Sequence, residues 1–121
     1  MLAVSSCKDD NIDAGASGNV EYGEGDCMPP IDYSSRVYYD YNGTIFFIEE
    51  SYTDSSLSYN YLKTISDSTI VENGEYVIDI QPGIYYVMPK EFYSARPENK
   101  ITVYLDKLTE QDFKFWHCTS Y

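Results

Sequence analysis

The sequence predicts an all-β protein, folded as a single antiparallel β-sandwich of about seven to eight strands behind a disordered N-terminal tether. Aromatic residues make up 17% of the 121 residues, and 14 of them are Tyr, a residue type enriched in strands. No window of about 11 residues keeps the i, i+3, i+4, i+7 apolar pattern of an amphipathic helix. A chain of this length can form one domain with a core of its own.

Apolar residues recur at short spacing between turn signals, which is the pattern of short strands. In chain order, we expect strands at Gly18–Tyr22, Arg36–Tyr39, Thr44–Tyr52, Leu57–Ile65, Glu75–Ile80, Ile84–Pro89, Lys100–Leu105 and Phe113–Tyr121. The dipeptides Asn42-Gly43 and Asn73-Gly74 predict hairpin turns, because Asn and Gly tolerate positive φ. Pro82-Gly83 suits a type II turn.

The N-terminal stretch contains a motif that suggests lipid attachment. Val4-Ser5-Ser6-Cys7 resembles the lipobox of bacterial lipoproteins, in which the cysteine thiol is diacylated. Lys8-Asp9-Asp10 is similar to the export signal that follows this cysteine in surface lipoproteins of the Bacteroidota. The resemblance implies a lipid on Cys7, attachment to the bacterial outer membrane, and display on the cell surface. The alternative is that Cys7 is a free thiol in a frayed tail.

This motif also divides the chain. Residues 1–6 would be a residual signal peptide, residues 7–17 a lipid-anchored flexible tether, and residues 18–121 the β-sandwich domain. The tether is expected because its residues are small, polar and acidic and show no periodicity. No apolar run of about 18 residues or more occurs, so the lipid is the expected membrane attachment.

Removing Cys7 from the count leaves two cysteines near the two ends of the predicted domain. Because an exported lipoprotein passes through an oxidising compartment, we expect a Cys27–Cys118 disulfide. The alternative is a pair of unpaired buried thiols. Such a bridge would close a long loop and stabilise the fold by about 4 to 5 kcal/mol in the chain-entropy model.

The segment ENGEYVIDIQPGIYYV, residues 72–87, contains a turn, a Gly-x-Tyr, alternating apolar residues and a Tyr-rich strand after Pro-Gly. Within it, Tyr76, Ile78 and Ile80 are expected to face inward. It resembles the signature of carboxypeptidase regulatory-like, transthyretin-like β-sandwich domains, and the likeness extends over about residues 17–121. It implies a transthyretin-like or immunoglobulin-like sandwich. A fold of this kind hosts many functions.

The net charge of −12 argues against nucleic acid as a partner, because a polyanion would be repelled. We expect no metal and no cofactor, since Cys27, Cys118 and the single His117 are too few for a zinc site. We also expect no catalytic residues: neither a Gly-x-Ser-x-Gly elbow nor a Ser-x-x-Lys motif occurs. His117 and Cys118 are neighbours in a predicted strand, so their side chains would diverge.

Two function hypotheses remain. The first is a non-catalytic binding or adhesion module with a glycan or protein ligand. Its contacts would come from aromatic and amide side chains beside predicted turns. These residues are Tyr39, Tyr41 and Asn42 in one group and Tyr59, Asn60 and Tyr61 in the other. The alternative is a structural accessory lipoprotein of an envelope complex, with no ligand of its own; clustering of exposed aromatic residues would favour binding.

Overall fold

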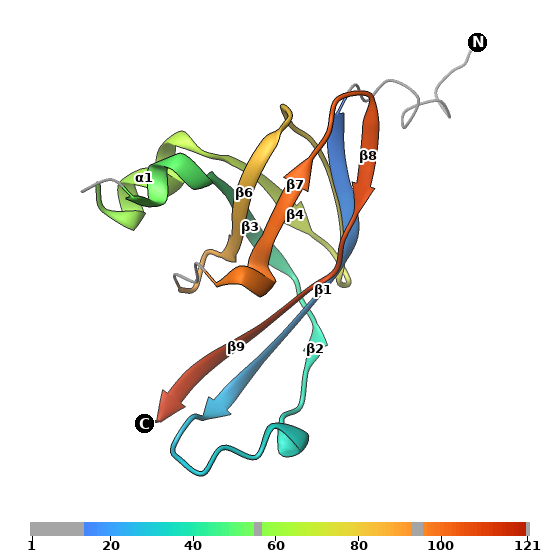
Figure 1. Cartoon of the computed structure of the whole chain (residues 1–121). Helices are drawn as coiled ribbons and strands as arrows, with labels where there is room; N and C mark the ends of the chain where they lie inside the picture. The colour runs from blue at the N-terminus through green and yellow to red at the C-terminus, as the bar shows by residue number, and fades with distance from the viewer. Residues whose placement is uncertain (1–13, 55–56, 93–95, 121) are drawn as a thin grey trace.

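The computed structural model describes residues 14–54, 57–92 and 96–120, and it confirms the all-β sandwich (Figure 1). One sheet is built on β1, which pairs with β2, β5, β8 and β9, and the other has the order β4-β3-β6-β7. The strands are β1 Ala14–Asp26, β2 Tyr39–Asp40, β3 Gly43–Glu49, β4 Asp67–Val71, β5 Glu75–Asp79, β6 Gly83–Pro89, β7 Lys100–Val103, β8 Lys107–Glu110 and β9 Phe113–Ser120. All pairs are antiparallel except β1 with β8 and β1 with β9, which are parallel.

The strand β1 belongs to two parts of the molecule. Its first half lies between β5 and β8 in the sandwich, and its second half lies between β2 and β9 in a ribbon that projects from the sandwich (Figure 1). Thirteen residues of strand span roughly 40 Å. We call residues 20–40 together with β9 the distal ribbon. It carries the C-terminal end of β9 at its tip, far from the point where β1 begins.

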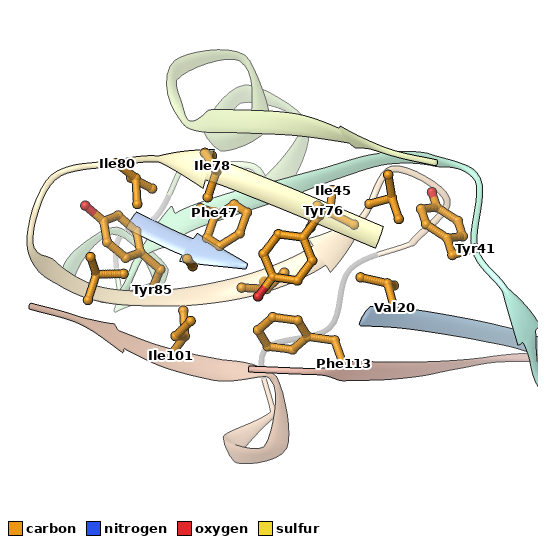
Figure 2. Packing of buried hydrophobic residues seen from close by; sticks show 14 of the residues in the cluster. Val20, Tyr41, Ile45, Phe47, Tyr76, Ile78, Ile80, Tyr85, Ile101 and Phe113 are labelled. Atoms are coloured by element: carbon orange, nitrogen blue, oxygen red, sulfur yellow. The ribbon is translucent and has the colours of Figure 1, made fainter. Parts of the chain in front are cut away.

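The core lies between the two sheets (Figure 2). Strand β5 shows the expected alternation, with Tyr76 and Ile78 buried, Glu75, Val77 and Asp79 exposed, and Ile80 buried just after the strand. The ring of Tyr76 lies among those of Phe47 and Phe113, at centroid distances of 6.1 and 6.0 Å. A smaller cluster of Ile48, Leu62 and Met88 lies on the other face of the second sheet.

Two of the predicted turns have different outcomes. At Asn73-Gly74 both residues have positive φ, 52° and 77°, as a two-residue type I′ turn requires, and this turn joins β4 of one sheet to β5 of the other. Asn42-Gly43 does not form a hairpin, because β2 and β3 belong to different sheets. Instead, Asn42 Oδ1 accepts a hydrogen bond of 2.8 Å from the backbone N–H of Asn73.

The predicted strand Leu57–Ile65 is wrong, because Tyr59–Ile65 forms a helix, α1. Ser58 caps this helix by accepting a hydrogen bond from the backbone N–H of Tyr61, and Leu62 buries its side chain. The predicted strand Gly18–Tyr22 is too short at both ends, since β1 runs from Ala14 to Asp26 and the alanines at its start are buried. Among the described residues, no helix has the length and apolar character needed to cross a membrane.

The strand bounds differ most in the first half of the chain. The predicted strand Arg36–Tyr39 is reduced to Tyr39–Asp40, and residues 27–38 form a loop that contains the 3-10 helix η2, Tyr33–Ser35. The predicted strand Thr44–Tyr52 ends at Glu49, where the 3-10 helix η3, Glu50–Asp54, begins. Strands β4 and β8 were not expected. A third 3-10 helix, η4, covers Pro97–Asn99.

Candidate functional site

A hollow of about 1150 Å³ lies on the distal ribbon. Its walls come from β1, from β9, from the loop of residues 27–38 and from the segment around η4. Three of the eight Lys and Arg residues of the chain, Arg36, Arg96 and Lys114, are among these walls. The walls also contain four acidic residues, Glu21, Asp40, Glu98 and Asp112, so the hollow is much closer to charge balance than the chain as a whole.

The outer face of the ribbon is organised around Trp116, the one tryptophan of the chain. The guanidinium carbon of Arg36 lies 4.7 Å from the centre of the Trp116 ring and 4.6 Å from that of Tyr33. The ring of Tyr38 meets the indole edge to face at 5.5 Å. Cation–π contacts of this kind each stabilise by about 0.5–1 kcal/mol or more. They hold the loop of residues 27–38 against β9.

Two glycines of β1 make room for the indole. In the parallel pairing, Gly23 and Gly25 face Trp116 and Cys118, so they lie on the same side of the ribbon. A Cβ atom at Gly23 would lie 2.7 Å from Cζ3 of Trp116, and one at Gly25 would lie 2.6 Å from Cζ2. The alternating glycines in the sequence YGEGD therefore leave a surface without side chains, against which this ring packs.

A disulfide closes the tip of the ribbon. Cys27 and Cys118 are bonded, with their Cα atoms 5.5 Å apart, which confirms the predicted pair. Cys27 begins the loop and Cys118 lies on β9, so the bond fixes the same loop that Arg36 holds. Arg36 also donates a hydrogen bond to Cys27 Sγ at 3.7 Å.

The charged residues of the outer face form weak pairs. Lys114 Nζ lies 3.8 Å from Glu21 Oε1 and 4.8 Å from the centre of the Tyr38 ring. Arg96 and Glu98 are 3.9 Å apart, and both are mostly exposed. Exposed pairs of this type contribute little to stability, so these side chains remain available to a ligand.

The inner face of the ribbon contains an aromatic and polar cluster. Tyr22 donates a hydrogen bond of 3.0 Å to Glu24, and its oxygen lies 3.1 Å from Nδ1 of His117. The ring of Phe92 packs against His117 at 5.0 Å and against Tyr22 at 6.1 Å. Burial and the neighbouring Glu24 carboxylate raise the pKa of Tyr22 well above its ordinary value of 10.0. The phenol therefore stays protonated and acts as a donor.

His117 and Cys118 are not placed as a Cys–His pair. Cys118 is in a disulfide and is not a thiol nucleophile. His117 lies on the opposite face of β9, where it is hydrogen-bonded to Tyr22. Among the described residues, no three His, Cys, Asp or Glu side chains gather closely enough to hold a metal ion. What the geometry does supply is a rigid, concave surface of aromatic and charged side chains.

The predicted contact residues lie in three different environments. Tyr39 is on the ribbon and its side chain is 67% exposed, as expected. Tyr41 is only 4% exposed and belongs to the core (Figure 2), so the expectation that it faces solvent is wrong. Its hydroxyl donates a hydrogen bond of 2.6 Å to Glu91 Oε1. Asn42 is exposed, but its side chain already bonds the Asn73 turn. Residue order along the chain could not reveal this, because β2 ends before Tyr41 and the chain turns into the core.

Tyr59, Asn60 and Tyr61 are exposed on α1, which packs beside β3, away from the distal ribbon (Figure 1). The two predicted groups are thus not brought together into one surface. Cys7, Lys8, Asp9 and Asp10 lie outside the described residues.

Sequence reasoning missed Tyr33, Arg36, Lys114 and Trp116 as residues of one surface. The signal that would have pointed to them is the alternation of Gly23 and Gly25, since glycine at every second strand position suggests close approach of a neighbouring group. Comparisons with protein-family models, with curated proteins and with solved structures gave no match to this chain.

Proposed function

We propose that the chain is a cell-envelope lipoprotein, anchored to the outer membrane through Cys7, that acts as a non-catalytic binding or adhesion module through its distal ribbon. The observation that carries this proposal is the hollow on the ribbon, lined by aromatic and charged side chains. The relation to carboxypeptidase regulatory-like, transthyretin-like domains is part of the proposal, and the β-sandwich with its inward-facing Tyr76 is compatible with it.

The placement of exposed residues supports the ribbon as the contact surface. Five large apolar or aromatic side chains of the segment from residue 28 to residue 39 are exposed: Met28, Ile31, Tyr33, Val37 and Tyr39. Exposed apolar side chains that gather in one segment are typical of interaction sites. Two buried N–H groups of the same surface, Arg36 Nε and Trp116 Nε1, have no hydrogen-bond partner among the described residues. Such groups cost free energy unless a ligand or water satisfies them.

The direction of β1 adds a geometric argument. The lipid would lie on the N-terminal side of Ala14, whereas the ribbon tip lies at the other end of β1 (Figure 1). An anchored chain would therefore present the ribbon away from the membrane.

The binding proposal is tested by screening the full chain against a glycan array and against a random peptide library. Tyr33→Ala and Tyr39→Ala should each weaken a ribbon-dependent interaction at least tenfold. Tyr104→Ala, which removes an exposed ring in the turn between β7 and β8, is the matched control and should change nothing. If all three substitutions weaken the affinity equally, or if no substitution changes it, the ribbon is not the contact surface.

The anchor is tested separately in a bacterial host, with a complete signal peptide supplied. Cys7→Ala should abolish fatty-acid labelling and membrane fractionation. Asp9→Ala combined with Asp10→Ala should keep the lipid and reduce surface exposure. Labelling that persists without Cys7 would refute the anchor.

The structural accessory role is the second candidate, and one observation favours it. Arg36 and Trp116, the two side chains best suited to recognition, already contact each other. If both screens stay empty while the anchor is confirmed, this role replaces the first.

A further inference from the structure

The strand β9 forms an edge of the sheet built on β1. Among the described residues, β9 has β1 as its single sheet neighbour. With eight residues, it is the longest edge strand of the described structure; β2, β4, β5, β7 and β8 have two to five. Natural sheets usually protect such edges with charges, prolines or bulges, because unpaired N–H and C=O groups accept another strand. The strand β9 contains no proline and no acidic residue; Lys114 is its one lysine or arginine, and the irregularity in its pairing with β1 is confined to its C-terminal end, after Cys118.

The hollow of the distal ribbon extends along this edge. Its walls include Phe113 and Phe115 from the inner face of β9 and Lys114 and Trp116 from the outer face. Because neighbouring residues of a strand point to opposite faces, a hollow that reaches both sets must pass around the edge. Arg96 and Glu98, beside η4, form the opposite wall. The space is thus bounded on both sides, which suits a single extended chain better than a second folded domain.

We propose that the edge of β9 binds an extended segment of another protein, which adds to the sheet as a further strand. This inference rests on the proposed binding function and names its partner class. Main-chain hydrogen bonds would supply affinity, since about every second residue of β9 directs its N–H and C=O away from β1. Side chains of the segment would alternate between the two walls.

The chemistry of the walls defines the segment. On the inner side the half-buried ring of Phe92 is the apolar group that a segment can reach, because Phe113 and Phe115 are only 3% and 1% exposed. At least one residue of the segment, facing Phe92, should therefore be apolar. The charged residues of the hollow nearly balance, with Arg36, Arg96 and Lys114 against four acids. The four acids are Glu21, Asp40, Glu98 and Asp112. A segment with little net charge fits such a balance, even though the whole chain carries −12.

The test uses the full chain and a phage-displayed library of random peptides. Each selected peptide is synthesised in two N-methylated forms, one blocking the odd and one the even backbone amides. Strand addition predicts that one form loses at least tenfold in affinity and the other binds like the unmodified peptide. The two forms are matched controls that leave the protein unchanged, so misfolding cannot explain a difference.

The location is read from amide hydrogen exchange. The peptide should slow exchange at alternate amides of β9 and leave the edges of β2, β5 and β8 unchanged. Equal loss of affinity in both methylated forms, protection at another edge, or a library that yields no binder would overturn the proposal. Protection of β9 that is present without peptide and rises with protein concentration would assign the edge to a second copy of this chain, and would also overturn it.

The two proposals fail in distinguishable ways. If the peptide library is empty but a glycan binds in a manner that depends on Tyr33 and Tyr39, strand addition is wrong and the binding module remains. If both screens are empty, the binding function fails as well.

Discussion

The guanidinium carbon of Arg36 lies over the indole of Trp116, at 4.7 Å from the ring centre, and Gly23 and Gly25 leave room for the same ring. This contact joins the loop of residues 27–38 to the last strand. It makes the single tryptophan of the chain a spectroscopic reporter for the distal ribbon alone.

Arg36→Ala should expose the indole. We expect a red shift of the tryptophan emission and a loss of about 1 kcal/mol in the free energy of unfolding, because two cation–π contacts disappear. Fluorescence spectra and urea unfolding measure the two effects. Arg96→Ala removes an equally charged side chain that forms an exposed ion pair with Glu98, and it should leave both unchanged. An unshifted spectrum of Arg36→Ala would show that the stack does not form in solution.

Gly25→Ala should displace Trp116 from the other side. The added Cβ would lie 2.6 Å from Cζ2 of the indole, and its three nearest atoms all belong to this ring, so the ring or the strand must move. Overpacking of this kind typically costs about 1–3 kcal/mol. The emission spectrum should shift while far-UV circular dichroism keeps its β character. A variant as stable as the parent, with an unshifted spectrum, would contradict the close packing of the ribbon.

Replacing Cys27 and Cys118 together by Ala should lower the free energy of unfolding by about 4 kcal/mol, because the bond closes a loop that spans most of the domain. Urea unfolding of oxidised protein measures the difference. The reduced parent should resemble the double variant. Peptide mapping that finds both thiols free, in protein made in an oxidising compartment, would refute the bond.

Tyr41→Phe should alter stability at high pH. Burial, followed by the hydrogen bond to the Glu91 carboxylate, raises the pKa of Tyr41 well above 10.0 in the folded chain. Above about pH 10 the unfolded chain binds fewer protons than the folded one, so the free energy of unfolding falls as pH rises. The Phe variant cannot ionise and should lose stability less steeply, although it starts about 1–2 kcal/mol lower near pH 7 because the hydrogen bond is missing.

Urea unfolding between about pH 8 and pH 11 measures both slopes. Tyr61→Phe changes an exposed ring on α1 and is the matched control. If the free energy of unfolding of Tyr41→Phe falls with pH as steeply as that of the parent, the pKa of Tyr41 is not raised in the folded chain.

The fold class was predictable because alternation and composition are local properties. Tyr76, Ile78 and Ile80 are buried as their spacing indicates. The helix α1 was not predictable in this way, since its seven residues include two tyrosines and an isoleucine, which favour strands. Its formation depends on the Ser58 cap and on burial of Leu62. The burial of Tyr41 was not predictable either, because its polar neighbours Asp40 and Asn42 suggested a surface turn.

The ribbon could not be predicted from local patterns. It exists because β1 continues past the sandwich and finds a parallel partner in β9, which lies at the other end of the sequence. A pairing at such separation leaves no periodic signature. The disulfide alone could be inferred, because cysteine parity does not depend on topology.

The participation of β1 in both the sandwich and the distal ribbon has a mechanical consequence. A pull between the N-terminal end of β1, Ala14, and the C-terminal end of its parallel partner β9 acts in opposite directions on two paired strands. Sheet hydrogen bonds run across the strands, so this load would shear many of them at once instead of opening them one after another. Tension applied at the ribbon tip would thus reach the N-terminal side of the molecule through its most resistant direction.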